Sequence, residues 1–367
     1  MRILWFNWRD IRNPDAGGAE VFTHEIMRRL AWKGHQMTLF TSSFANCLPN
    51  DSIDGVDIIR EGGKYTVYSK AKKYYQSYHR HYDLVVDEIN TRPFLTPTFV
   101  KEGQPIIAII HQLAREFWFY ETRFPVSYIG YYFLEKRWLS HYRDLVTTTV
   151  SKSTKKDLDQ LGFRKVVVLP QGLSVKPLPE VPHKEADPTI VFVGRLKRAK
   201  LPHHALQAFF TIKKEIPEAK MWVIGDGYMR QELEKYSTRD VIFFGFVPSK
   251  EKNELISKAH LLLVPAVREG WGLVVTEANA MGTPAVGYDV PGLRDSIKDG
   301  ETGTLVKENS PSALAASAIA LLEDPHKLIK YSRNALEFSR RFSWVNTSEA
   351  FNAIISKFPR ARAGVMA

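Results

Sequence analysis

Residues 261–277 read LLLVPAVREGWGLVVTE. The apolar run Leu261–Val264 predicts a buried strand, and a helix is expected to begin near Leu273. In doubly wound α/β folds, ligands are held beyond the carboxyl ends of such strands. The loop between strand and helix carries Glu269 in a glycine-rich turn, and Glu277 follows one turn into the helix. The stretch therefore predicts both a fold class and the position of a site.

The same strand–helix rhythm extends along the whole chain. Short β-branched runs such as Ile3–Phe6, Ile106–Ile110 and Ile190–Val193 alternate with helical patterns such as Ala19 to Lys33. Nearly continuous apolar strands between helices are typical of parallel sheets covered on both faces. The predicted fold class is α/β, with two doubly wound, Rossmann-like domains facing a cleft.

A proline-rich stretch divides the chain into its predicted parts. Residues 173–188 contain four prolines and few apolar side chains, which is typical of a linker. We therefore expect an N-terminal domain at 1–172 and a C-terminal domain at 189–342. Residues 343–367 are expected to form a helix and tail that cross back to the N-terminal domain.

Composition excludes several classes of protein. The chain has 367 residues, of which 44% are hydrophobic and 25% are charged, so it is neither disordered nor of low complexity. Its single cysteine, Cys47, rules out an intramolecular disulfide and cysteine-only zinc sites. The first apolar run is too short for a signal peptide, and we expect a cytoplasmic location. The formal net charge of +11 favours anionic partners without choosing among them.

Three further motifs carry residues suited to anions or sugars. Gly17 and Gly18 stand at an expected helix start, where backbone N–H groups favour an anion, although a plain turn explains them equally well. Gly194, Arg195 and Lys200 follow a strand, so that the two cations could clamp a diphosphate; a solvated basic loop is the ordinary alternative. His111 directly follows an apolar strand and, taken alone, reads more simply as a structural histidine.

Taken together, the motifs resemble one family. The ordered set of Gly17-Gly18, His111, Gly194-Arg195-Leu196 with Lys200, Gly225-Asp226-Gly227 and Glu269-x7-Glu277 is similar to the family-4, glycogen-synthase-like glycosyltransferases of GT-B fold. The resemblance extends from Arg2 to about Phe358. The chain departs from the family pattern at Leu201, Gln171 and Pro291, none of which removes a charged group.

The resemblance implies a retaining transfer of a hexosyl unit from a UDP-sugar or GDP-sugar, with an alpha linkage and without a metal or other cofactor. It implies catalytic roles for Glu269, His111, Arg195 and Lys200. The implied substrate-binding residues are Gly17, Gly18, Gly194, Gly245, Phe246, Val247, Gly270, Trp271, Gly272, Leu273, Val274 and Glu277. Among these, Glu277 would bind the ribose and residues 245–247 would lie near the base.

The expected acceptor is a glycan or a lipid-linked sugar, bound by the N-terminal domain. Residues 60–82 combine six basic residues with six tyrosines, and residues 115–143 contain 11 aromatic residues. Basic and aromatic side chains together suit an anionic membrane surface, so a peripheral position at the inner face of the membrane is one reading. A packed helical hairpin with a basic outer face is the other.

Rival functions are a sugar-nucleotide 2-epimerase of the same fold and a non-enzymatic protein that binds glycans or nucleic acid. The epimerase would ask Glu269 and His111 to act as acid and base. The spaced glutamates in their glycine-rich setting favour transfer, and we expect no nucleic-acid partner. A dinucleotide dehydrogenase is excluded because no strand–helix turn carries G-x-G-x-x-G; Arg230 stands in place of the third glycine after Gly225-Asp226-Gly227.

Overall fold

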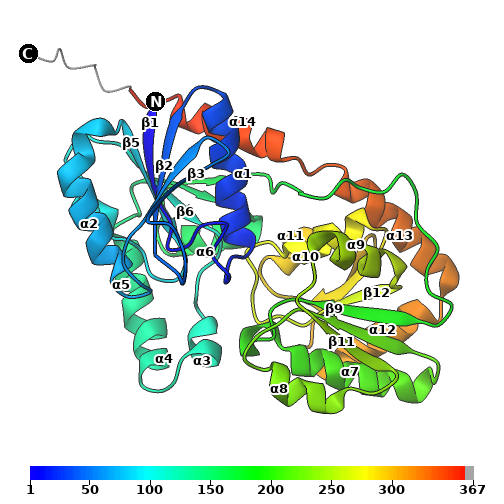
Figure 1. The fold of residues 1–367 in the computed structure, drawn as a ribbon. Helices are drawn as coiled ribbons and strands as arrows, with labels where there is room; N and C mark the ends of the chain where they lie inside the picture. Colours follow the sequence, from blue (N-terminus) through cyan, green and yellow to red (C-terminus); the bar gives the residue numbers. More distant parts are fainter. Residues whose placement is uncertain (360–367) are drawn as a thin grey trace, which may run out of the picture. The chain divides into compact units, whose positions relative to one another are not determined.

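The computed structural model describes residues 1–359, and the end of the predicted tail, residues 360–367, lies outside the described part. The chain divides into two compact units (Figure 1). Of the described residues, unit 1 contains Met1–Arg115, Tyr128–Gly172 and Ser343–Pro359, and unit 2 contains Glu116–Ser127 and Leu173–Phe342.

Unit 1 alternates strands and helices as predicted. Its strands are β1 (Arg2–Phe6), β2 (Gln36–Thr41), β3 (Asn50–Ile53), β4 (Val56–Arg60), β5 (Leu84–Ile89), β6 (Ile106–Ile110), β7 (Val146–Thr149) and β8 (Lys165–Val168). Its helices are α1 (Gly18–Trp32), α2 (Val67–Tyr78), α5 (Glu135–Ser140), α6 (Lys152–Gln160) and α14 (Trp344–Ile355), with short turns at His79–His81 and Thr96–Thr98. Helix α4 (Val126–Ile129), whose first two residues group with unit 2, continues into a π-helical turn at Gly130–Leu134.

The sheet of unit 1 has the order β3-β4-β2-β1-β5-β6-β7-β8 and is parallel except for β3. Sequence analysis did not anticipate β3, because its polar residues Asn50, Asp51 and Ser52 carry no strand pattern. The strand order reverses between β1 and β5, so the chain leaves the carboxyl ends of these two adjacent strands in opposite directions along the sheet. The Asn90 side chain donates to the Asn7 side chain at 3.0 Å across this point.

Helix α14 packs within unit 1. The Trp5 ring of β1 lies 5.4 Å from the ring of Phe351. The Thr347 hydroxyl donates to the Pro170 carbonyl at 2.6 Å, and Gly172 lies directly against the Trp344 ring. The segment at residues 170–172 and the C-terminal helix α14 thus pack together in unit 1.

Unit 2 is a second α/β layer structure. Its strands are β9 (Thr189–Val193), β10 (Lys220–Ile224), β11 (Val241–Gly245), β12 (Leu261–Val264), β13 (Ala285–Tyr288) and β14 (Gly303–Val306). Its helices are α3 (Phe117–Glu121), α7 (Pro202–Glu215), α8 (Arg230–Leu233), α9 (Ser249–Lys258), α10 (Leu273–Ala280), α11 (Leu293–Ser296), α12 (Pro311–Leu322) and α13 (Pro325–Ser339). Two 3₁₀ turns, η4 (Arg198–Lys200) and η5 (Glu234–Tyr236), complete it.

The sheet of unit 2 is parallel throughout, with the order β11-β10-β9-β12-β13-β14. Counted within the unit, this is the order 3-2-1-4-5-6 of a doubly wound nucleotide-binding fold, and it reverses between β9 and β12. The strands are almost wholly buried because helices cover both faces. The predicted doubly wound α/β class is confirmed.

One segment groups differently from the predicted boundaries. Sequence analysis kept Glu116–Ser127 in the N-terminal domain, but these residues pack with unit 2. The segment makes polar contacts from both ends of α3: the Glu116 carboxylate, just before the helix, pairs with Arg268, and the Glu121 carboxylate accepts from the backbone of Ala199. Charge pairing across so many residues leaves no periodic signal in a sequence.

Candidate functional site

Lys200 and Glu269 meet at the point where the sheet of unit 2 reverses. Lys200 ends the turn η4 after β9, and Glu269 lies in the loop after β12, so both stand beyond the carboxyl ends of adjacent strands. Their side chains form an ion pair, with Lys200 30% exposed and Glu269 12% exposed. Both residues were predicted to take part in catalysis, and the structure places them side by side. At this position the cation can bind a phosphate while the carboxylate accepts hydrogen bonds from sugar hydroxyls.

The loop of Glu269 is held from a second side by the turn after β13. The Glu269 N–H donates to the Pro291 carbonyl at 3.0 Å. Gly292 has φ +84°, and a Cβ built there would lie 2.2 Å from the Glu269 carbonyl oxygen. Glycine is thus required at position 292. At position 291 only the backbone carbonyl is used, so the proline that departs from the family pattern still accepts this hydrogen bond.

Gly194 and Arg195 belong to the same cluster of loops. Gly225 approaches Gly194 so closely that a Cβ at 225 would lie 2.0 Å from the Gly194 carbonyl oxygen. The loops after β9 and β10 are therefore stacked backbone on backbone. Arg195 is half-buried, and no ion pair to it is found within the described residues.

Helix α10 begins beside Glu269. Gly272 caps it in the left-handed conformation, at φ +89°, and Gly270, Trp271, Leu273 and Val274 surround this helix start. The ring of Trp271 packs at 5.4 Å on that of Phe342. Glu277 lies one turn into the helix as predicted, but it is paired with Lys252 of α9 at 2.7 Å. Sequence analysis missed Lys252, which carries no motif.

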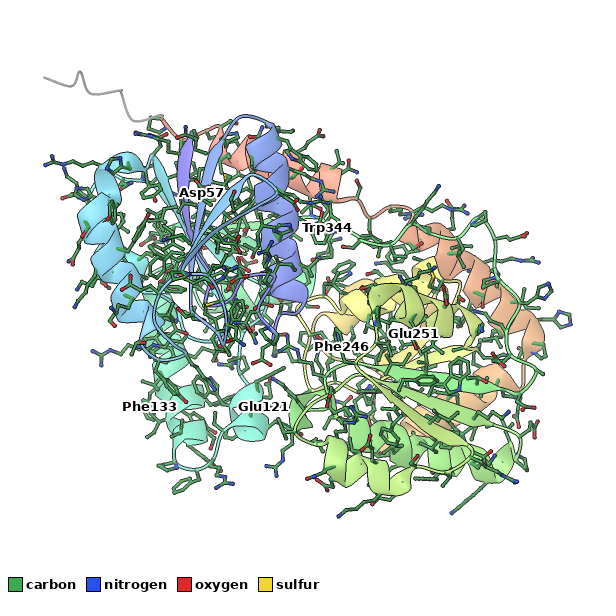
Figure 2. The ribbon with its side chains drawn as sticks, viewed as in Figure 1. Asp57, Glu121, Phe133, Phe246, Glu251 and Trp344 are labelled. Carbon is green, nitrogen blue, oxygen red and sulfur yellow. The ribbon has the colours of Figure 1, made fainter. Side chains whose placement is uncertain are left out.

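The predicted base-binding segment follows β11. Gly245 ends the strand at φ +70°, and its carbonyl accepts from the Gly225 N–H at 2.8 Å. Phe246 is 83% exposed, whereas Val247 packs against the core of unit 2 (Figure 2). An aromatic ring this exposed at a strand end offers a flat face for stacking.

His111 lies in unit 1, after β6, and is held by a buried carboxylate. Its Nε2 is 2.8 Å from Oε1 of Glu88, whose side chain is fully buried. Glu88 also accepts from the Trp5 indole at 2.7 Å and from the Thr23 hydroxyl. Three donors converge on one carboxylate, which fixes the orientation of the imidazole. Sequence analysis missed Glu88, because it is the fifth residue of an apolar strand and carries no motif.

The Gly17-Gly18 turn is engaged by its own helix. The Gly17 N–H donates to Glu20 Oε2 at 2.6 Å, and Glu20 is also paired with Arg9 at 3.1 Å. Gly18 is exposed and begins α1. The predicted helix start is therefore present, with a buried glutamate already bound to the Gly17 N–H.

The predicted membrane segments have exposed aromatic side chains. The helix running from Val126 to Ser140 exposes the rings of Tyr128, Tyr132 and Phe133, the last of them 69% exposed. Figure 2 shows Phe133 pointing away from the helix that carries it. In residues 60–82, Tyr65 is 75% exposed, whereas Tyr75 is buried in the core. Within residues 1–359, no helix has the length and apolar character needed to cross a membrane.

Two family models match the chain in succession. The first, described as Glycosyltransferase Family 4, matches residues 16–176, and the second, Glycosyl transferases group 1, matches residues 178–338. A D-inositol 3-phosphate glycosyltransferase from Thermobispora bispora is 27% identical, over 91% of this chain and 88% of that protein. One from Corynebacterium urealyticum is 32% identical over 46% of this chain, and the match spans only 43% of that relative's length.

Solved structures share the fold along the whole chain. Sucrose-phosphate synthase from Thermosynechococcus elongatus has a TM-score of 0.79 at 19% identity, covering 97% of this chain and 98% of that chain. HepE from Anabaena, in complex with UDP-glucose, has a TM-score of 0.74 at 16% identity, covering 97% and 100%. The predicted GT-B fold class, with two α/β domains, is thereby confirmed.

Proposed function

Because the chain belongs to the glycosyltransferases, with a family 4 N-terminal half and a group 1 C-terminal half, we propose that it is a retaining hexosyltransferase. The donor is a UDP-sugar or a GDP-sugar, and the product carries an alpha linkage. The acceptor is a glycan or a lipid-linked sugar. No metal or other cofactor is needed.

The observation that carries this proposal is the ion pair of Lys200 and Glu269 at the reversal of the unit 2 sheet. Doubly wound folds bind nucleotides at this point. Lys200, with Arg195 on the same loop, provides positive charge for a diphosphate, and Glu269 provides acceptors for sugar hydroxyls. Phe246 offers a stacking face for a base at the end of β11.

In the proposed reaction, the bond between the anomeric carbon and the diphosphate oxygen breaks, and a bond from the acceptor oxygen forms on the same face of the sugar. The acceptor proton passes to the departing phosphate. Negative charge grows on the leaving group, so donors aimed at it are the largest catalytic contribution. Lys200 and Arg195 supply such donors, which supports a reaction without a metal. Glu269 positions the sugar and is not assigned as a nucleophile.

The acceptor side belongs to unit 1 in this proposal, with His111 contacting the transferred sugar. Since Nε2 is bound to Glu88, His111 keeps Nδ1 for its second partner. D-inositol 3-phosphate, named for the Thermobispora relative, is a suitable first soluble acceptor to screen. A phosphorylated polyol would also match the basic surface of residues 60–82.

We further propose a peripheral contact with anionic membrane, from the cytoplasmic side, through residues 60–82 and 115–143. Exposed rings such as Phe133 and exposed lysines such as Lys72 and Lys73 support it. The protein should co-sediment at low salt with vesicles of 30–40% anionic lipid, and 0.5 M salt should release it. Protein that stays in the supernatant at low salt would rule out this contact.

The donor is tested by a thermal-shift panel of UDP, GDP, ADP and NAD in EDTA. A ligand at 100 times its dissociation constant stabilises the folded state by about 2.7 kcal/mol. For a domain of the size of unit 2, each kcal/mol moves the melting midpoint by roughly 2–4 °C. A selective shift with UDP or GDP is expected. If neither nucleotide shifts the midpoint at millimolar concentration, the transferase proposal is wrong and the protein is a non-enzymatic binding protein.

A further inference from the structure

Helix α3 lies in a short segment that groups with unit 2, and the proposed reaction assigns it no role. Residues Glu116–Ser127 follow His111 closely and are flanked on both sides by unit 1, yet they pack with unit 2. Within unit 2, α3 contacts the turn η4, which carries Lys200. The segment therefore lies against the loop that is proposed to bind the donor diphosphate.

The Glu121 carboxylate caps this turn. Its Oε1 accepts the Ala199 N–H at 3.0 Å, one residue before Lys200. The Tyr228 hydroxyl donates to the same carboxylate, at 3.1 Å from Oε2, and accepts the Arg198 N–H at 2.8 Å. The first two N–H groups of η4 are thus bound by a carboxylate and a hydroxyl. A charged acceptor at such a position holds a turn more firmly than water does.

The Glu116 carboxylate holds the second loop in the same way. It accepts from Arg268 Nε at 3.0 Å, and Arg268 is the residue before Glu269. The Arg268 side chain is only 8% exposed, and a guanidinium that is this buried requires an anionic partner. The loops are also joined directly, because the Val267 N–H donates to the Ala199 carbonyl at 3.0 Å.

We propose that Glu116 and Glu121 are positioning residues that fix the backbones of the two loops, so that Lys200 and Glu269 meet in the geometry needed for transfer. Each glutamate acts one residue away from a member of the ion pair; Glu116 caps the start of α3 and Glu121 is its last residue. The proposal rests on the transferase function proposed above. It makes α3 part of the donor machinery of unit 2, although the sequence places it between two segments of unit 1.

The test compares Glu121→Ala with the conservative Glu121→Gln, using exposed Glu251 of α9, changed to Ala, as a matched control (Figure 2). Loss of a charge-assisted hydrogen bond should lower kcat about tenfold or more. Glu121→Gln keeps an oxygen for the Ala199 N–H and should restore kcat to within about threefold of wild type. The Glu251→Ala control should transfer at the wild-type rate. A glutamate that only stabilised the fold would lower the melting midpoint and leave kcat at 20 °C unchanged.

Hydrogen exchange at the Ala199 amide reports on its hydrogen bond to Glu121, and it needs no sugar donor. Exchange should be faster in Glu121→Ala and close to wild type in Glu121→Gln. If wild-type protein transfers sugar and Glu121→Ala transfers equally well, the positioning role is wrong while the proposed function stands. If wild-type protein neither binds UDP or GDP nor transfers, the proposed function fails and the positioning role fails with it.

Discussion

Unit 1 and unit 2 present their candidate functional residues in opposite ways. In unit 1, His111 directly follows a buried strand, and its partner Glu88 is fully buried and shared with Trp5 and Thr23. In unit 2, Lys200 and Glu269 are partly exposed and lie on loops. These loops are supported by hydrogen bonds with neighbouring loops and with α3. A residue on a rigid element comes already oriented, whereas residues on loops need supporting contacts.

The two units should therefore tolerate substitutions differently. The histidine of unit 1 depends on one buried carboxylate, so its orientation should be lost in a single step. The ion pair of unit 2 depends on several weaker contacts, so its geometry should degrade gradually. Residues that act directly on the diphosphate should still give the largest losses.

The largest effect is expected from Lys200→Ala and Glu269→Ala. For Lys200→Ala, removal of a donor aimed at developing charge typically costs about 2.7–4 kcal/mol of barrier, which is roughly a 10²–10³-fold loss of kcat. Glu269→Ala removes the carboxylate that accepts from the sugar hydroxyls, so the sugar should no longer be held for transfer. Both side chains are on loops and partly exposed, so the melting midpoint should change little. Steady-state transfer assays with each variant check this. Near wild-type turnover in either variant would remove that residue from the site.

The next effect is expected from Glu88→Gln in unit 1. An amide cannot accept from Trp5, Thr23 and His111 as a carboxylate does, so the imidazole should lose its fixed orientation. We expect kcat to fall about 10–100-fold, the loss typical of such supporting residues, while the affinity of unit 2 for UDP or GDP is unchanged. A variant that loses nucleotide affinity as strongly as turnover would contradict the separate roles of the units.

A smaller effect is expected from Phe246→Ala. Stacking of a base on an aromatic ring is worth about 1–3 kcal/mol, so the dissociation constant for the nucleotide should rise roughly tenfold. Because this ring is 83% exposed, thermal stability should be unchanged. Calorimetric titration of wild type and variant measures both quantities. Equal affinities would place the base elsewhere.

The smallest effect concerns acid stability of unit 2. Burial, with a smaller contribution from Lys184, lowers the pKa of His260 to about 4. Its Nδ1 accepts the Thr189 N–H, at the start of β9, at 3.0 Å. A histidine in the unfolded chain titrates near 6.5, so the unfolded state binds the proton first and stability is lost as pH falls from about 6.5 to 4.

Between pH 7 and pH 5, this histidine should account for about 1–2 kcal/mol of lost stability, reduced by its partial exposure. Urea unfolding at the two pH values measures the loss. His260→Asn retains an acceptor for the Thr189 N–H and does not titrate, so it should reduce the dependence on pH. A variant with the full wild-type dependence would show that other groups are responsible.

The sequence predicted the parts of this molecule that follow from periodicity and from local motifs. The parallel strands and the start of α10 beside Glu269 are present in the structure, and Lys200 and Glu269 both follow strands as predicted. The partners that orient these residues were not predictable. Glu88 lies in an apolar strand, and Lys252 lies on the surface of α9, so neither carries a pattern.

The association of α3 with unit 2 was missed for a related reason. Its aromatic sequence indicates a helix that could pack on any apolar surface, and the choice is made by Glu116 and Glu121 with partners far along the chain. Such pairs have no fixed spacing in sequence. Only the fold brings them to hydrogen-bonding distance.

The role of Lys200 is tested most directly by calorimetric titration of UDP and GDP, in EDTA, into wild-type protein and into Lys200→Ala. One of the two nucleotides should bind the wild type without a metal. Binding should weaken at least tenfold in the variant, since a charge-assisted contact to phosphate is lost. No binding of either nucleotide to the wild type, or equal binding to both proteins, would contradict the proposal that Lys200 at the reversal of the unit 2 sheet holds the diphosphate of a sugar donor.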